Sequence, residues 1–407
     1  MSRGSSEPSH WLERVRVVAT YLRIMLRTAM LIWLRRPYKL SLLIAGGCNL
    51  RCRICSSWKR ENSTLTLDEV RRIWEAFRIK PCWVNISGGE PTLNPALESI
   101  LLFFVSMNRP LLITLTTNGI ENITSLIERV LHRDQRSLVY ISVSIDGDAP
   151  AHDTARGHPG AFASARHTFE CLATSALSTP FLKVGMSTTV SRFNFDQLPS
   201  FVSSVLKETL ALNLNLARVS DYYGNLEEEP VESLPRGPLV RILREVQRSV
   251  VCPTPDSVLK VVFLETAIRR LQGKTASFPC SSFVSNVLIT SDLDLMTCTL
   301  CFEKWHDQIS AREEKLESLV DAIRHPSPRR SVLHRRIRLS GCEERCLTPC
   351  ESYMHIIASL LNPIRAPGIV GGFVRIYIAS LLTGSKRRAR RRIEDKRAIH
   401  GPVDERS

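Results

Sequence analysis

The N-terminal stretch of the sequence has no apolar run that could cross a membrane, and the whole chain is poor in aromatic residues. In the arginine-rich stretch 11–36 the longest uncharged segment is 28–34, well short of the roughly 20 apolar residues that span a bilayer. The same stretch lacks a small-residue cleavage site followed by a polar mature start, so no signal peptide is expected. Aromatic residues make up 7% of the chain, and no patch in its middle interleaves them with basic residues, which disfavours a nucleic-acid interface.

Acidic charge is also scarce, because 40 acidic residues face 55 basic ones and the formal net charge is +15. Such an excess favours nucleic acid or an anionic membrane surface as a partner, although much of it lies at the two ends of the chain. The 407 residues, 43% of them hydrophobic, suffice for one large domain and a smaller one. The twelve cysteines are clustered, which in a long enzyme-like chain predicts metal or redox sites in a reducing cytoplasm.

The two ends of the chain carry the basic segments. Residues 11–36 predict an amphipathic helix, with Trp, Val, Leu and Met on one face and arginines on another. This arrangement suits a helix in the plane of a membrane interface, and equally one docked on the domain with its arginines in water. The tail from Ser385 is expected to be a solvated or surface-binding segment. It holds a basic run made of Lys386, Arg387, Arg388, Arg390, Arg391 and Arg392.

From residue 40 onward, apolar strand-like runs alternate with helical patterns. Strands are expected at 40–45, 82–87, 111–116, 138–145, 181–189 and 212–217. The first helix follows Thr66, where Glu69 completes a capping box. Later helices are expected at 95–107, 122–132, 159–175, 195–208, 236–250 and 256–272. Six strand–helix units predict an α/β fold, namely a partial (β/α)6 barrel of the TIM type that is open on one side.

Three cysteines directly follow the first expected strand. Cys48, Cys52 and Cys55 have the spacing C-x3-C-x2-C, which can place three thiolates on three irons of one [4Fe–4S] cube. The fourth iron is then open for a substrate or cofactor, as in catalytic metal sites that keep an open position. The chemistry of a parallel sheet lies at the C-terminal ends of its strands, and this loop is at such an end. Structural, buried cysteines are the alternative.

Polar motifs follow the next strands at the same edge. In Gly88-Gly89-Glu90-Pro91 the glycines let the backbone approach a ligand, and the carboxylate could bind an ammonium group. Thr117-Asn118-Gly119 follows the third strand and Ser144-Ile145-Asp146-Gly147 the fourth. Alternation along the fourth strand places Tyr140, Ser142, Ser144 and Asp146 on one face.

Three charged or titratable residues come after the fourth strand. Arg156 could hold a carboxylate in a forked geometry. His152 and Asp153 are expected only to cap a turn or to lie at the surface.

These motifs, in this order over residues 40–220, resemble the radical S-adenosylmethionine (radical SAM) superfamily. The resemblance implies the partial barrel and two cofactors, a [4Fe–4S] cluster held by the three cysteines and S-adenosylmethionine chelated to its open iron. An electron from a donor such as flavodoxin or ferredoxin would cleave S-adenosylmethionine, and the resulting 5′-deoxyadenosyl radical would abstract hydrogen from the substrate. Ile54 departs from the aromatic residue that the family often has before its third cysteine.

The same resemblance implies which residues bind S-adenosylmethionine. They are Gly88, Gly89, Glu90, Asn118, Ser144, Asp146 and Arg156. Glu90 and the two glycines would hold the methionine amino group, and Ser144 and Arg156 its carboxylate. Asn118 or Asp146 would lie near the ribose or the substrate. No catalytic residue is assigned.

The fourth-strand motif, followed by His-Asp-x-x-Arg-Gly, resembles the branch with a cysteine-rich C-terminal extension called SPASM, or twitch when it is shorter. The candidate ligands here are Cys280, Cys298, Cys301, Cys342, Cys346 and Cys350. Residues 316–323 resemble a short helix of that extension. Its usual form has seven cysteines and a glycine where this chain has Leu293. One auxiliary [4Fe–4S] cluster is expected, with two, none or a zinc site as the alternatives.

The expected organisation has five parts. They are an amphipathic basic helix over 1–38, the radical SAM barrel over 39–225, a helical connector over 226–279, the auxiliary-cluster region over 280–355, and an amphipathic basic tail over 356–407. A cobalamin-binding domain is not expected, nor is an extra N-terminal domain of the kind that peptide-modifying members often use.

Three functions remain open at this point. The first is radical chemistry on a peptide or protein, as in the SPASM-type maturases that the extension resembles. The second is radical chemistry on a lipid-linked or membrane-associated small molecule, which the basic amphipathic ends favour. The third is a non-catalytic iron–sulfur protein that binds nucleic acid, for which the net charge is the support. The expected location is the cytoplasm, with membrane association as an addition to it.

Overall fold

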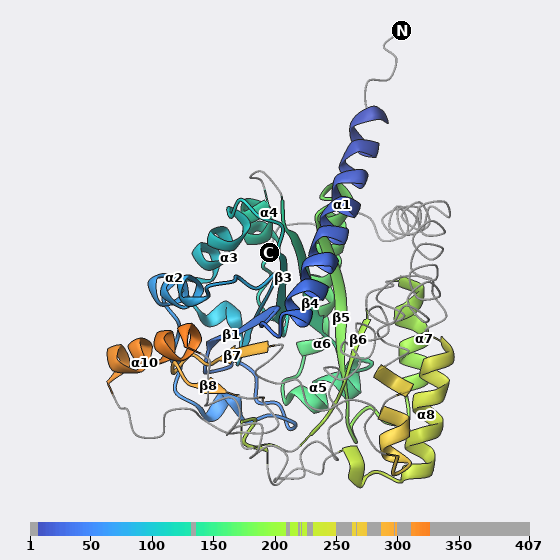
Figure 1. The fold of residues 1–407 in the computed structure, drawn as a ribbon. Coiled ribbons are helices and arrows are strands. Elements are labelled where there is room, and N and C mark those ends of the chain that lie inside the picture. The colour runs from blue at the N-terminus through green and yellow to red at the C-terminus, as the bar shows by residue number, and fades with distance from the viewer. Residues whose placement is uncertain are drawn as a thin grey trace, which may run out of the picture.

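A computed structural model gives the fold, which is an eight-stranded sheet curved into an open barrel and covered by helices (Figure 1). The structure describes residues 7–131, 136–208, 212–218, 220, 222–225, 231–249, 263–265, 267–274, 286–296, 298 and 311–325. The strand order is β6-β5-β4-β3-β2-β1-β7-β8. All pairs are parallel except β7 with β8.

The six expected strands are all present and pair in chain order. They are β1 (Lys39–Ala45), β2 (Trp83–Gly88), β3 (Leu112–Thr117), β4 (Leu138–Ser144), β5 (Leu182–Val190) and β6 (Leu212–Leu216). Parallel neighbours need a crossover connection, and helices supply it. These are α2 (Leu67–Ala76), α3 (Leu97–Val105), α4 (Thr124–Leu131), α5 (Ala149–Arg156), α6 (Ala161–Ser178) and α7 (Leu198–Glu208). The predicted partial (β/α)6 barrel is therefore confirmed.

The local signals that predicted these elements have clear counterparts. Thr66 caps α2 by accepting from the Glu69 backbone, and the Glu69 side chain accepts from the Thr66 backbone in return. Apart from α5, each crossover helix buries an apolar face on the sheet, and one large cluster joins β1–β6 to these five helices. At about 25 cal/mol per Å² of buried apolar surface, this cluster is the main stabilising contribution to the barrel. Residues 149–156, expected only as a strand-end motif, form the helix α5.

The open side of the barrel, beside β1, is occupied by a later part of the chain. β7 (Asn286–Ile289) pairs with β1 from Lys39↔Asn286 to Leu42↔Ile289, and β8 (Leu295–Met296) returns against β7. The turn between them needs a left-handed residue, and Leu293 adopts φ +63° while fully buried. This is the position at which the SPASM resemblance implies a glycine, and the conformation explains that preference.

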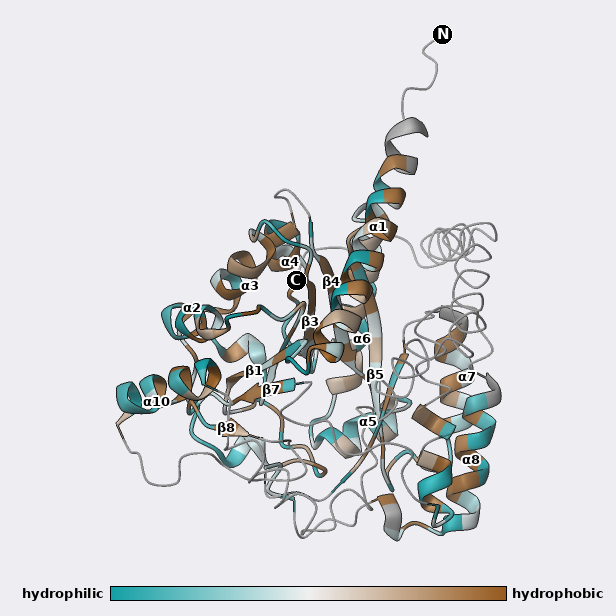
Figure 2. Cartoon of the chain, in the orientation of Figure 1, coloured by the Kyte–Doolittle hydropathy of each residue, from teal (hydrophilic) through white to brown (hydrophobic). Residues whose placement is uncertain are grey.

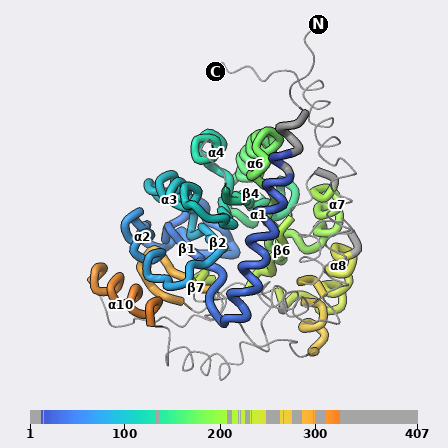
Figure 3. Tube along the Cα trace, turned by 45° about the horizontal axis from the view of Figure 1, so that its top comes forward, coloured from blue at the N-terminus to red at the C-terminus, as the bar shows by residue number. Residues whose placement is uncertain are grey.

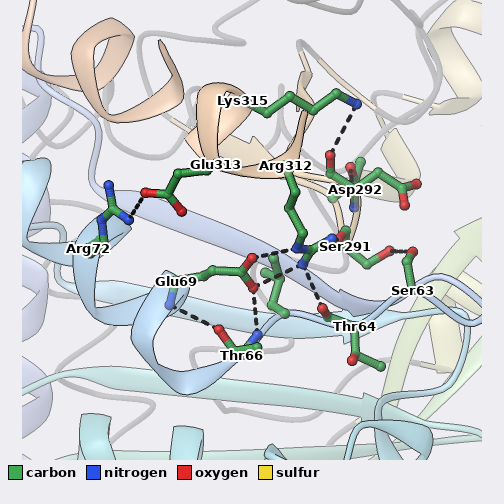
Figure 4. A network of polar contacts seen from close by, with 12 residues as sticks. Ser63, Thr64, Thr66, Glu69, Arg72, Ser291, Asp292, Arg312, Glu313 and Lys315 are labelled. Carbon is green, nitrogen blue, oxygen red and sulfur yellow. Dashed lines mark hydrogen bonds and ion pairs between the residues drawn. The ribbon is translucent and has the colours of Figure 1, made fainter. Parts of the chain in front are cut away.

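A helix of the same region is fastened to the barrel through a polar network (Figure 4). α10 (Arg312–Arg324) contains the expected 316–323 helix. Arg312 donates to both carboxylate oxygens of Glu69, at 2.6 and 2.9 Å, and to the carbonyls of Thr64 and Ser291. Burial raises the pKa of Glu69, but the hydrogen bonds from Arg312 and Thr66 lower it more. The network thus joins α10, the β7–β8 hairpin and the segment that follows the cysteine loop.

α1 (Glu7–Trp33) lies across the end of the barrel where the strands begin (Figure 3). Ile24 and Leu31 pack on residues at the N-terminal ends of five strands. Those residues are Tyr38, Cys82, Trp83, Leu112, Leu138 and Phe181. The prediction of a helix docked on the domain is therefore correct for this face. None of the helices in the described part of the chain combines the length and apolar character that a membrane crossing requires.

Two helices were predicted between β6 and the cysteine-rich region, and the structure describes the first and part of the second. α8 (Arg236–Ser249) matches the predicted helix at 236–250, and residues 263–265 and 267–271 of the predicted 256–272 helix are helical. The proposed tail from 356 lies outside the described residues.

Candidate active site

The loop with Cys48, Cys52 and Cys55 leaves the C-terminal end of β1, and neighbouring segments hold its backbone on three sides. Gly46 N donates to Ser63 O at 2.8 Å, Arg53 N to Ala155 O at 2.9 Å, and Ser56 N to Tyr223 O at 2.6 Å. The partners come from the end of the loop itself, from α5 and from the segment after β6. A short loop held in this way keeps its three thiols in fixed relative positions.

Asn225 is a support that sequence reasoning missed. Its side chain donates to Ile54 O at 2.8 Å and to Arg218 O at 3.1 Å, and it accepts from Ser220 N at 3.0 Å. It is 5% exposed, so these bonds form out of water, where an unpaired partner is costly. A single asparagine after a strand gives no signal in sequence, because its partner at Ile54 is far away along the chain.

The three thiols are half-buried, which suits metal ligation. Burial raises the pKa of Cys52 to about 11 and also raises that of Cys48, so without a metal both stay protonated at neutral pH. A bound metal removes that proton outright. No three His, Cys, Asp or Glu side chains in the described ranges are arranged to share a single ion. A cube presents a separate iron to each thiolate, so its ligands stand farther apart than those of one ion.

Gly88 and Gly89, at the end of β2, were expected to let the backbone approach a ligand, but the structure gives another reason for the absence of a side chain at these positions. A Cβ on Gly89 would lie 1.9 Å from Gly47 O, and one on Gly88 would lie 2.4 Å from Ala45 O. Gly89 N and Glu90 N already donate to Ala45 O and Gly47 O. The close approach is therefore to the backbone of the cysteine loop, and only carbonyls remain there to accept from an ammonium group.

Glu90 is a buried carboxylate that already accepts three hydrogen bonds. Its oxygens accept from Asn118 N at 2.7 Å, Thr117 Oγ1 at 2.8 Å and Thr92 N at 3.2 Å. Burial raises its pKa, and those donors offset part of the rise. A carboxylate offers about four acceptor positions, so one is left for a further cation.

Asn118 connects this carboxylate to the cysteine loop. Its backbone N–H bonds Glu90, and its side chain donates to Asn49 Oδ1 at 2.7 Å and approaches Cys48 Sγ at 3.8 Å. The third-strand motif is thus in contact with the first, as expected for strand ends at one edge. Its side chain amide lies beside the loop, where it fixes Asn49.

The fourth-strand motif supplies a buried ion pair. Arg156 Nη2 lies 2.8 Å from Asp146 Oδ2, and the two side chains are 12% and 1% exposed. Burial alone would lower the pKa of Arg156, but Asp146 and Cys52 raise it, so the guanidinium stays charged beside the cysteine loop. Arg156 Nε and Asp146 Oδ2 have no regular hydrogen bond. These orphaned buried atoms are what a bound polar ligand would satisfy.

His152 and Asp153 have structural roles. His152 is fully buried and its Nδ1 accepts from Asp146 N at 3.0 Å. Burial and the nearby Arg156 lower its pKa to about 4, so the ring is neutral. Asp153 accepts from Gly160 N and Phe162 N, both at 2.7 Å, which confirms the expected capped turn but places His152 in the core instead of at the surface.

The inner wall of the barrel is polar near these motifs. Asn213 donates to Tyr140 OH at 3.1 Å, with Ser142 Oγ at 3.5 Å, which confirms that the two share a face. Ser144 is half-buried and pairs in register with Ser187 on β5. Asn215 donates to that Ser187 at 3.1 Å. The wall offers hydroxyls and amides one or two residues from the buried ion pair.

The expected auxiliary ligands are largely outside the described residues. Cys298, just after β8, is half-buried and free of a disulfide. Cys280, Cys301, Cys342, Cys346 and Cys350 lie outside the described part of the chain.

Comparison with known proteins relates part of this chain to one family. Residues 42–177 match the family model described as Radical SAM superfamily. Mycofactocin maturase MftC of Mycobacterium ulcerans is 28% identical over 197 residues, which cover 47% of this chain and 51% of that protein. AdoMet-dependent heme synthase of Methanosarcina barkeri is 32% identical over 160 residues, covering 38% and 43%. The chain thus spans about half the length of these relatives.

Solved structures share the fold. SuiB of Streptococcus suis, in a crystal structure bound to S-adenosylmethionine, aligns with a TM-score of 0.52 at 14% identity and covers 72% of this chain and 67% of its own. The aligned architecture is the partial barrel described above. The S-adenosylmethionine and [4Fe–4S] cluster of the family suit a loop of three half-buried thiols, a carboxylate with one open acceptor position, and a buried arginine whose Nε has no hydrogen-bond partner. The motif order, the barrel and the match over residues 42–177 agree with one another, and this part of the chain is similar to the radical SAM superfamily.

Proposed function

We propose that Cys48, Cys52 and Cys55 hold a [4Fe–4S] cluster, and that the protein is a radical SAM enzyme acting on a peptide or protein. The observation that carries the proposal is the meeting of the cysteine loop with Glu90 and Arg156 at one edge of the barrel. Glu90 reaches the loop through Asn118, and Arg156 interacts with Cys52 itself. When bound, the cluster and S-adenosylmethionine together supply an electron-driven C–S cleavage that yields a 5′-deoxyadenosyl radical.

The chain's own residues would bind and orient the cofactor. Glu90 keeps one acceptor position for the methionine ammonium group, next to backbone carbonyls of Gly88 and Gly89. Arg156 would turn from Asp146 toward the methionine carboxylate, or hold both, because a guanidinium has five donors. Ser144 would add a hydroxyl to the same carboxylate. Asp146, at the head of the polar wall, would lie beside the ribose or the substrate.

The preference for a peptide or protein rests on the maturase among the relatives and on the resemblance of the C-terminal cysteines to SPASM. The polar inner wall supports it physically, because hydroxyls and side-chain amides such as Ser142 and Asn213 can bond to peptide groups. The hairpin and α10 support the extension. They belong to the expected 280–355 region and join it to the barrel. A flavodoxin- or ferredoxin-type protein would be the electron donor.

A lipid-linked or membrane-associated small molecule is the second candidate. The observation in its favour is the row of exposed apolar side chains on α1, which include Leu26 and Trp33. Its active-site chemistry would be the same, and only the substrate would differ.

Two measurements test the cluster and the substrate separately. Iron counting on anaerobically reconstituted protein should give on the order of four irons for the barrel site, and Cys52→Ala should lose them. A Cys342/Cys346/Cys350 triple Ala variant should retain the barrel irons and lose any auxiliary ones. For the substrate, a deuterated candidate peptide should transfer deuterium into 5′-deoxyadenosine. Transfer from a deuterated lipid-linked compound instead would contradict the peptide assignment.

A further inference from the structure

The outer face of α1 concentrates the exposed apolar surface of the described chain. Nine large hydrophobic side chains are exposed in the described part of the chain. Seven of them lie between Leu12 and Leu34, and the other two are Trp58 and Ile79. Single exposed apolar residues need no explanation, but a contiguous group indicates an interaction surface. Figure 2 shows apolar residues recurring along the coloured part of α1, including turns that project beyond the barrel.

These side chains form one stripe. The α1 members are Leu12, Val15, Leu22, Leu26, Met30 and Trp33. With 3.6 residues per turn, their spacing confines them to an arc of about 80°. Ile24 and Leu31, which pack on the barrel, lie on the other side of the helix. The stripe is therefore a second apolar face, in addition to the face that the fold uses.

The charge beside the stripe is positive. Arg16 and Arg23 are exposed and flank it along one edge, and Arg35 and Arg36 are exposed just past its end. The acidic residues of α1 are Glu7, at its first position, and Glu13, which is half-buried. An apolar stripe bordered by arginines complements a surface that is apolar below and negative above, which is the interface of an anionic bilayer.

We propose that this surface, the outer face of α1, docks on an anionic phospholipid membrane, with the stripe at the acyl boundary and the arginines at the headgroups. Two other occupants fit less well. A second copy of the chain would bring its own arginines against these. The chain's tail from Ser385, with two lysines and seven arginines against four acidic residues, has the same sign of charge.

The docking surface is at the far end of the barrel from the cysteine loop. α1 packs on the strands' N-terminal ends, whereas the loop and Glu90 follow their C-terminal ends. Seven-residue β1 separates the two by roughly 20 Å at about 3.3 Å per residue. A membrane-docked molecule would thus turn its active site away from the lipid. Docking of this kind would bring the enzyme to a bilayer and leave its active site open to the water phase.

Vesicle flotation of the full-length protein tests the proposal. Wild type should float with vesicles of phosphatidylcholine mixed with phosphatidylglycerol, and much less with phosphatidylcholine alone. Leu26→Glu with Trp33→Glu should reduce binding at least about tenfold, since each side chain loses its apolar transfer. The matched control is Ala163→Glu with Ser204→Glu, which adds the same charge to exposed positions of α6 and α7 and should bind as wild type.

Failure of wild type to float with the anionic vesicles would overturn the proposal. So would equal binding to neutral vesicles, or equal binding by wild type and the α1 variant. A wild-type dimer that the α1 variant converts to monomers, without lipid binding, would assign the stripe to self-association instead. Iron content and S-adenosylmethionine cleavage should be the same in all three proteins, so the outcome is independent of the proposed enzymatic function.

Discussion

Arg156 Nη2 lies 2.8 Å from Asp146 Oδ2, and both side chains are almost closed to solvent beside the cysteine loop. Arg156→Gln should leave the Asp146 carboxylate buried and unpaired, at a cost of about 3–5 kcal/mol in the free energy of unfolding. Asp146→Asn with Arg156→Gln should restore much of that stability, because two neutral amides can pair. Denaturant unfolding measures both.

Variants of Arg156 and Asp146 also allow the effect on folding to be distinguished from the effect on cofactor binding. The double variant should regain stability and iron content but still bind S-adenosylmethionine weakly by calorimetry, because the guanidinium for its carboxylate is gone. Arg129→Gln is the matched control, since it breaks an exposed pair with Glu98. Normal S-adenosylmethionine affinity in the double variant would contradict the role assigned to Arg156.

His152 predicts a pH dependence of stability. Its pKa is lowered to about 4 by burial, against about 6.5 in an unfolded chain. The unfolded state therefore binds more protons between those values, and stability falls as the pH drops from about 6.5 to 4. The loss should reach about 3 kcal/mol. In His152→Asn, whose side-chain oxygen can accept from Asp146 N, this part of the pH dependence should disappear. Unchanged slopes in denaturant titrations across this range would show that His152 is protonated equally in both states.

The backbone conformation of Leu293 predicts that a glycine variant at this position is more stable than an alanine variant. Its φ of +63° strains any residue with a Cβ by roughly 1–2 kcal/mol, while its buried side chain contributes more than that. Leu293→Ala should lose about 2–5 kcal/mol, because it removes the packing and keeps the strain. Leu293→Gly removes the strain as well, and should be the more stable of the two by up to about 1 kcal/mol. Thermal unfolding that ranks Ala above Gly would place the turn in another conformation.

The contact between Arg312 and Glu69 predicts a coupling between α10 and the barrel. The pair is partly buried and bidentate, so a double-mutant cycle with Glu69→Gln and Arg312→Gln should give a coupling energy of about 1–2 kcal/mol. The exposed pair Arg129–Glu98 should give no more than about 0.5 kcal/mol. Equal coupling in the two cycles would mean that the network does not fasten α10.

Asn225 should matter for cluster retention. Asn225→Ala removes the bond to Ile54 O and leaves that carbonyl and Ser220 N without their partner. The protein should still fold and take up iron, but should lose it to a chelator several times faster than wild type. Asn213→Ala, which alters the inner wall away from the loop, is the control and should release iron at the wild-type rate.

Local pattern predicted most of the barrel. The six strands and the Thr66 capping box were predictable because apolar runs and side-chain caps act over a few residues. The pairing of β7 with β1 was not, because Asn286–Ile289 is only four residues long and its partner is remote in sequence. α5 was missed because a short helix with a Pro at its start resembles a turn.

The site was predictable as a set of strand ends but not in its internal contacts. Cys48, Glu90, Asn118 and Asp146 are brought together because parallel strands share one edge. That Gly89 touches Gly47 O, or that His152 braces Asp146, depends on ångström-scale packing between segments that no spacing rule describes.

The central claim, that this loop supports reductive cleavage of S-adenosylmethionine, has one direct measurement. Anaerobic wild type, reconstituted with iron and sulfide and given dithionite and S-adenosylmethionine, should release 5′-deoxyadenosine. Cys52→Ala should release none. A wild-type protein with a spectroscopically intact cluster that forms no more 5′-deoxyadenosine than Cys52→Ala would contradict the account.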